Sequence, residues 1–90
     1  MDKETLLELV WEEVLVVMPE LASLEPAAEH RLDDMGFDSL QRVQLVSRLE
    51  DRLEIELPDH APGSLVTISD VRNDVLSILN TQKDSAKPNH

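Results

Sequence analysis

Three segments of this chain carry apolar residues at three- and four-residue spacing, and this spacing limits its possible folds more than any other feature. The segments cover residues 4–18, 39–53 and 68–80. Because such spacing places apolar side chains along one face of a helix, it predicts three amphipathic helices. Nothing in the pattern supports a sheet. The sequence therefore predicts an all-α fold, a small antiparallel bundle of three to four helices with a long first loop.

The core of this fold must be small and aliphatic. A chain of 90 residues supports one domain whose core is a single thin layer. Trp11 and Phe37 are its only aromatic residues. The residues predicted to face inward from the three helices are Leu6, Val10, Val14, Val17 and Leu21, then Leu40, Val43, Val46, Leu49 and Leu53, then Ile68, Val71, Val75, Ile78 and Leu79. We expect Leu21, Leu24, Leu32 and Met35 to fasten the first loop to this core.

Prolines and capping residues predict where the helices begin and end. Pro19 breaks the first helix and opens a loop over residues 19–38, with a helical turn near residues 26–30. Either Asp38 or Ser39 can cap the second helix. Thr67 and Asp70 have the spacing of a capping box before the last helix.

The C-terminal part of the chain carries further signals. A short fourth helical turn is predicted within residues 59–66, a segment that Pro62 and Gly63 interrupt. The polar residues 81–90 are predicted to form a disordered tail after a single domain, residues 1–80.

The charge of the chain excludes several kinds of partner. Nineteen acids against eight bases give a net charge of −11, which disfavours nucleic acid and anionic membrane surfaces. No apolar run approaches the roughly 18 residues of a membrane span, and the acidic start of the chain differs from a signal peptide. The absence of cysteine excludes disulfides and thiolate catalysis. We expect a monomer in the cytoplasm.

Ser39 is the residue whose setting most suggests a function. It follows Gly36, Phe37 and Asp38 and stands at the start of the second predicted helix. There its hydroxyl is exposed near free backbone N–H groups, which favour an attached phosphodiester. Ser39 can be such an attachment point, or it can be a plain helix cap.

Two other kinds of chemistry fit the residues poorly. A hydrolase nucleophile elbow needs glycines where Phe37 and Gln41 stand, and a histidine within reach of Ser39. The histidines lie in predicted loops and the tail, at His30, His60 and His90. The acids near the serine, Asp33, Asp34 and Asp38, lack the spacing of a calcium loop. These acids fit a solvated loop, or they could contribute ligands to a Mg²⁺ ion that a partner enzyme holds. We expect no metal site in this chain.

Residues 32–40, Leu-Asp-Asp-Met-Gly-Phe-Asp-Ser-Leu, resemble the attachment site of acyl carrier proteins and related carrier domains. The resemblance continues over roughly residues 5–80. Its further matches are Val43, Leu45, Val46 and Leu49-Glu50, then residues 53–59 and residues 67–71.

This resemblance implies a specific function. Ser39 would accept 4′-phosphopantetheine from coenzyme A through a separate, Mg²⁺-dependent phosphopantetheinyl transferase. The thiol of that group would hold acyl intermediates as thioesters. The chain itself would be no enzyme, and its other partners would load or process acyl groups, as a ketosynthase, acyltransferase or ligase does.

The resemblance also implies a docking surface on the second helix. Its residues would be Asp38, Leu40, Arg42, Val43, Gln44 and Ser47, of which Asp38 and Leu40 would help the transferase recognise the site. Leu40 and Val43 could instead belong to the core.

The second helix departs from the pattern of fatty-acid-synthase carriers, which usually place acids there. Residues 39–53 hold three arginines and two acids, a net charge of +1, whereas residues 2–18 carry −4. Arg42 is placed to pair with Asp38 one turn earlier. These departures favour a carrier for polyketide, nonribosomal-peptide or similar specialised biosynthesis. The alternatives are a carrier for primary fatty acid synthesis and a helical interaction protein in which Ser39 is only a cap.

Overall fold

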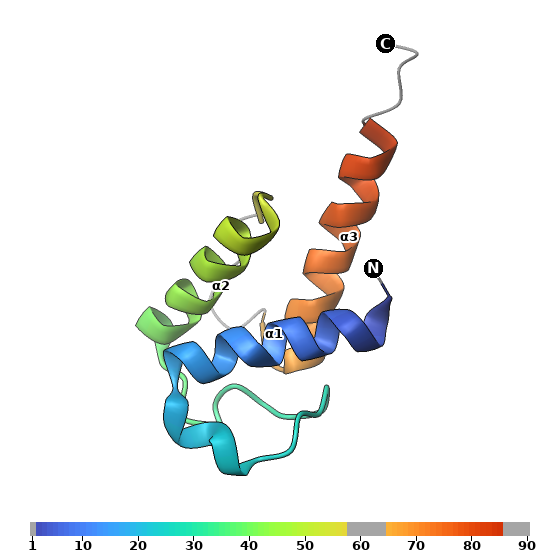
Figure 1. Ribbon diagram of the computed structural model, residues 1–90. Coiled ribbons are helices and arrows are strands. Elements are labelled where there is room, and N and C mark those ends of the chain that lie inside the picture. The colour runs from blue at the N-terminus through green and yellow to red at the C-terminus, as the bar shows by residue number, and fades with distance from the viewer. Residues whose placement is uncertain (1, 58–64, 86–90) are drawn as a thin grey trace.

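The computed structural model describes residues 2–57 and 65–85 and contains three α-helices and one short 3₁₀ helix (Figure 1). In chain order these are α1 (Lys3–Val17), η1 (Pro19–Ser23), α2 (Ser39–Leu53) and α3 (Ile68–Ser85). The described residues form no strand and only one isolated bridge, between Arg31 and Thr67. The predicted all-α class is confirmed.

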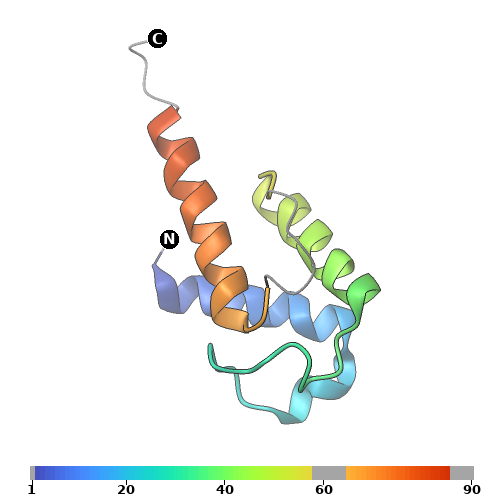
Figure 2. The same ribbon diagram turned by 180° about the vertical axis from the view of Figure 1, so that it is seen from behind.

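Helix α1 is the common packing partner of the other elements. It contacts α2, α3 and η1. Figures 1 and 2 show α2 and α3 running in the same direction from one side of α1, while the loop between η1 and α2 lies on the other side. The core therefore lies along α1.

The end of α1 differs from the prediction in one respect. A 3₁₀ helix follows α1 at once, whereas the sequence predicted a helical turn near residues 26–30. Pro19 occupies the start of this short helix, where its fixed φ is suitable and its missing N–H is not needed. Within residues 26–30, where the sequence predicted a helical turn, the structure has only a turn at Ala28 and Glu29.

The start of α3 is as predicted, and its end is not. Thr67 and Asp70 form the expected capping box, because the Thr67 N–H donates to Asp70 Oδ2 at 3.0 Å and the Asp70 N–H donates to Thr67 Oγ1 at 3.2 Å. The helix then continues to Ser85, so residues 81–85 are helical and not a disordered tail. Residues 68–85 contain no proline or glycine that would stop the helix earlier. The domain limit predicted at residue 80 thus falls inside α3. Residues 58–64, which include most of the predicted fourth helical turn, and residues 86–90 lie outside the described residues.

The inward face of α2 was predicted incorrectly at its first two positions. Leu40 and Val43 are each 64% exposed, whereas Leu45 and Leu49 are buried. Val43 lies two residues before Leu45, about 200° away around a helix, so the two cannot both face α1. The side of α2 that carries Leu45 and Leu49 contacts the core, and the side that carries Leu40 and Val43 faces solvent.

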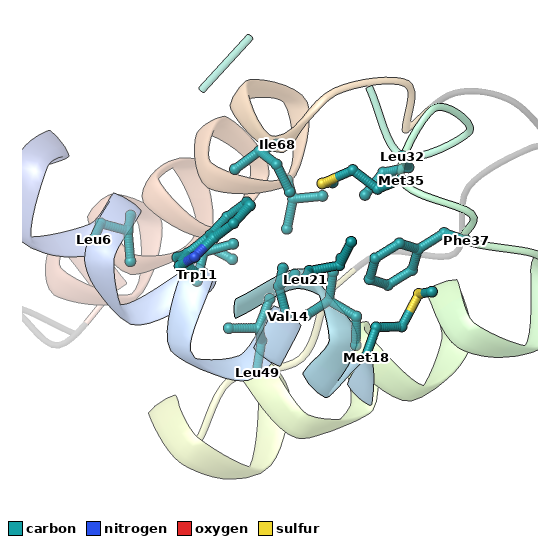
Figure 3. Packing of buried hydrophobic residues seen from close by; sticks show 14 of the residues in the cluster. Leu6, Trp11, Val14, Met18, Leu21, Leu32, Met35, Phe37, Leu49 and Ile68 are labelled. Atoms are coloured by element: carbon teal, nitrogen blue, oxygen red, sulfur yellow. The ribbon is translucent and has the colours of Figure 1, made fainter. Parts of the chain in front are cut away.

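Buried side chains from the long first loop complete the core. Leu21, Leu32, Met35 and Phe37 are all buried, whereas Leu24, which we also expected to fasten the loop, is 38% exposed. Figure 3 shows Met35 and Phe37 turned toward the side chains of the helices. This anchoring fixes the loop that leads to α2.

Backbone hydrogen bonds hold the same loop against the start of α3. The Leu32 N–H donates to the Val66 carbonyl at 2.9 Å, and the Ile68 N–H donates to the His30 carbonyl at 3.0 Å. The His30 ring packs on Trp11 of α1 with ring centroids 5.4 Å apart. The loop is therefore joined to both α1 and α3.

A buried carboxylate joins α1 to α2. Glu13 is only 6% exposed. Its Oε1 accepts a hydrogen bond from Arg48 Nε at 2.7 Å, and its Oε2 accepts one from Arg52 Nη1 at 2.8 Å. Arg52 also contacts Glu12 at 2.9 Å. Because two guanidinium groups compensate the burial of Glu13, this cluster fixes which face of α2 contacts α1.

The Glu13 cluster predicts acid-sensitive stability. Burial by itself raises the pKa of Glu13, but hydrogen bonds from Arg52 and Arg48 outweigh it and hold the pKa below its ordinary value of 4.5. A carboxyl whose pKa is lower in the folded state stabilises the protein above its unfolded pKa, and this contribution is lost as the pH falls through the folded value. We expect Glu13→Gln to lower the free energy of unfolding at pH 7 by about 1–2 kcal/mol, since the arginines are partly exposed.

Urea denaturation of both proteins between pH 7 and pH 3 measures this effect. The difference between wild type and Glu13→Gln should shrink as the pH falls below 4.5. A difference that stays constant over this range contradicts the assignment.

Candidate functional site

The chain leaves the core immediately before α2. Gly36 has a positive φ of 93°, a conformation that side chains other than glycine rarely adopt. Phe37, which is 4% exposed, then anchors the backbone in the core. Asp38 and Ser39 follow at the surface. The position of Ser39 is thus fixed on one side by a buried aromatic residue and on the other by a helix.

Asp38, and not Ser39, caps α2. The Gln41 N–H donates to Asp38 Oδ1 at 2.9 Å, and the Asp38 N–H donates to Gln41 Oε1 at 3.0 Å, which forms a complete capping box. Ser39 is the first residue of the helix. The alternative in which Ser39 serves only as the cap is therefore wrong.

The surroundings of Ser39 fit an attached phosphodiester. Ser39 is exposed, and its hydroxyl bonds to no residue in the described part of the chain. The backbone N–H groups of Ser39 and Leu40 likewise have no acceptor among residues 2–57 and 65–85. The first turn of α2 itself contains no acid, and the Asp38 carboxylate that caps the helix bonds to the Gln41 N–H and leaves the N–H groups of Ser39 and Leu40 free. A phosphate bound to the hydroxyl would lie where helix N-termini favour anions.

The exposed face of α2 next to Ser39 is uncharged and partly apolar. Leu40, Val43, Gln44 and Ser47 are all exposed, and their spacing places them along one side of the helix. The structure thus brings together four of the residues that the resemblance assigned to docking. Residues 39–49 contain no acid.

The arginines of α2 do not form a free basic surface. Arg42 pairs with Asp33 of the preceding loop, and not with Asp38 as predicted. Asp38 is already committed to the helix cap, whereas Asp33 lies in the loop fixed beside it. Arg48 and Arg52 pair with acids of α1. All three positive charges are therefore compensated by acids outside α2.

Neither a metal site nor a histidine base emerges near Ser39 in the described residues. No group of three His, Asp or Glu residues in residues 2–57 and 65–85 could hold a metal ion. Asp33 is bound to Arg42, and Asp34 lies 4.0 Å from Arg31. The His30 ring packs on Trp11. The other two histidines, His60 and His90, lie outside the described residues.

Gln41 is the residue near the site whose role the sequence analysis missed. Gln41 was considered because it stands where a nucleophile elbow needs a glycine, and it was not identified as a capping residue. The available signal was its spacing, since Asp at one position and Gln three residues later before an apolar run is typical of a capping box.

The described part of the chain is a small helical domain that presents an exposed serine, Ser39, at the start of a capped helix. None of the helices in the described part of the chain is long and apolar enough to cross a membrane. Residues 5–73 match the family described as phosphopantetheine attachment site. The chain therefore belongs to this family of acyl carrier domains.

Individual relatives support the same conclusion. The chain is 41% identical over 68 residues to the acyl carrier proteins of Campylobacter concisus and Campylobacter fetus, with 71% of this chain and 88% of each relative aligned. It is also 30% identical over 80 residues to the non-reducing polyketide synthase phnA of Penicillium herquei, which covers 89% of this chain and 3% of the synthase. No solved structure matches the chain significantly.

Membership of this family establishes the general function. The chain is a carrier and not an enzyme, and its prosthetic group is covalently attached 4′-phosphopantetheine, whose thiol carries acyl groups as thioesters. Its partners are a phosphopantetheinyl transferase and enzymes that process acyl groups. These predictions are confirmed.

Proposed function

We propose that Ser39 carries the phosphopantetheine group and that this chain shuttles acyl thioesters between enzymes. The observation that supports this most directly is the unbonded hydroxyl of Ser39 at the first position of α2, beside two free backbone N–H groups. The bound acyl chain would move with the domain because its attachment is covalent, and the exposed position of Ser39 would leave it accessible to partner enzymes.

The attachment reaction makes one demand on this chain. Ser39 Oγ forms a bond to the phosphorus next to pantetheine in coenzyme A, and the pyrophosphate bond to adenosine 3′,5′-bisphosphate breaks. The hydroxyl proton passes to a base of the transferase. The carrier supplies only the exposed hydroxyl, and Asp38 holds the helix that presents it.

Intact mass measurement tests this proposal. The purified protein is incubated with coenzyme A, Mg²⁺ and a broad-specificity phosphopantetheinyl transferase. We expect the mass to rise by one phosphopantetheine, and fragmentation to place the increase on Ser39. An unchanged mass with several such transferases, or a modification at another serine, would contradict the assignment.

We propose further that partner enzymes dock on the exposed face of α2. This surface consists of Asp38, Leu40, Val43, Gln44 and Ser47. Arg42 is excluded from it because its guanidinium group is bound to Asp33. Leu40 and Val43 are the largest exposed apolar side chains of α2, so their burial in a complex supplies most of its affinity.

Single alanine substitutions at Leu40 and Val43 test the docking surface. Because each truncation removes apolar area that would be buried in the complex, we expect each to lower kcat/KM for the transferase by about 5- to 30-fold. Val16→Ala is the matched control, since Val16 is a valine of α1 that is 52% exposed. Equal rates for Val43→Ala and Val16→Ala would place the docking surface elsewhere.

We propose that the pathway is polyketide or another specialised biosynthesis rather than primary fatty acid synthesis. The support is the uncharged face of α2, since fatty-acid-synthase carriers usually show acids there. Partners such as a ketosynthase, acyltransferase or ligase would then recognise apolar contacts near Ser39, with the carrier acting as a cytoplasmic monomer. Intact mass of the native protein identifies its cargo, and a simple saturated acyl series would contradict this part of the proposal.

A further inference from the structure

Gln41 controls the geometry of the residue that precedes Ser39. Every backbone hydrogen-bonding group of Asp38 is occupied: its N–H donates to Gln41 Oε1 at 3.0 Å, and its carbonyl accepts the Arg42 N–H at 3.0 Å. Its carboxylate accepts the Gln41 N–H at 2.9 Å. Two of these three bonds involve Gln41.

The side-chain bond of Gln41 is the one that other residues of the helix cannot replace. The Asp38 carboxylate and carbonyl bonds use backbone N–H groups, which every residue except proline offers. The Asp38 N–H, however, needs a side-chain acceptor three residues later. Without it, the Asp38 N–H loses its acceptor, and the backbone entering α2 is restrained by the buried ring of Phe37 and by the remaining carboxylate and carbonyl bonds of Asp38.

We propose that Gln41 is a positioning residue for the modification of Ser39. By accepting from the Asp38 N–H, its amide oxygen holds the Phe37–Asp38 peptide in one orientation, so the segment that leads into Ser39, and with it the hydroxyl, is already placed when the transferase arrives. Gln41 acts through Asp38 and does not touch the reacting atoms. This inference rests on the proposed modification of Ser39.

The consequence is kinetic. Where the reactive conformation is only partly populated, the apparent affinity falls by that fraction. Loss of the Gln41 acceptor should therefore raise the KM of the transferase for this carrier and leave kcat at saturating carrier nearly unchanged.

Two substitutions of similar length separate the acceptor from the rest of the side chain. Gln41→Met keeps the size and the helix propensity but removes the oxygen, whereas Gln41→Glu keeps an acceptor at the same place. We expect Gln41→Met to raise KM about five- to tenfold and Gln41→Glu to restore it to within about twofold of wild type. Asp2→Ala is the control for a lost helix cap far from the site, because Asp2 caps α1 through Thr5.

Amide hydrogen exchange of the unmodified protein provides a readout that needs no transferase. The Asp38 N–H should exchange at least about fivefold faster in Gln41→Met than in wild type, and Gln41→Glu should reverse the change. Equal KM values for Gln41→Met and Asp2→Ala, no rescue by Gln41→Glu, or unchanged exchange would each overturn the inference. If wild type itself is never modified, the proposed function fails, whereas these outcomes leave it intact.

Discussion

Ser39→Ala should accept no phosphopantetheine, while its helical circular dichroism stays close to that of wild type. The substitution removes the hydroxyl oxygen that we propose forms the new bond to phosphorus. It leaves the cap of α2 intact, because Asp38 and Gln41 make the capping bonds. Intact mass after incubation with coenzyme A and a transferase measures the first effect, and a thermal melt measures the second.

Two further variants sharpen this result. Ser23→Ala changes another exposed serine, in η1, and should be modified as fully as wild type. Asp38→Ala removes the helix cap and should cost about 1 kcal/mol of stability. A large loss of stability in Ser39→Ala, as large as in Asp38→Ala, would show that the serine has the structural role that the geometry assigns to Asp38.

Leu49→Ala should destabilise the domain by about 2–5 kcal/mol, a large share of the total stability of a domain this size. Leu49 is completely buried where α2 meets α1, so its truncation leaves a cavity in a thin core. Chemical denaturation monitored by circular dichroism measures the difference.

Leu40→Ala is the matched control for Leu49→Ala. Both are leucines of α2, but Leu40 is 64% exposed, so its truncation should change the free energy of unfolding by no more than about 0.5 kcal/mol. Comparable losses in the two variants would mean that α2 is rotated about its axis relative to the structure described above.

The comparison of Leu40 with Leu49 also shows which features of α2 the sequence could predict and which it could not. Periodicity located α2 over residues 39–53, and the structure has the same bounds. It did not choose the inward face, because apolar residues occur on two sides of this helix. The pairs that Arg48 and Arg52 form with Glu13 lie on the side that contacts α1, and these partners are 35 and 39 residues apart in sequence. A contact between residues so far apart cannot be read from local spacing.

In the candidate site, too, some features could be predicted from the sequence and others could not. The motif around Ser39 was sufficient to predict the attachment point and its cofactor by resemblance, and the family match confirms the cofactor. The charge of the surrounding surface was read incorrectly from α2 alone. Arg42 was counted as a free charge, but Asp33 of the loop neutralises it. Net charge along one helix therefore did not predict the charge that a partner would meet.

The sequence by itself determined the class of fold, the limits of α2, the capping box of α3 and the identity of the chain as a carrier. These features depend on local spacing, on capping residues and on a short motif, all of which are complete within a few residues. The tertiary structure alone decided that Leu40 and Val43 face solvent, that Glu13 is buried between α1 and α2, and that the arginines of α2 are compensated. These depend on how α1, α2 and the first loop pack together, because burial and ion pairing are set by neighbours distant in sequence.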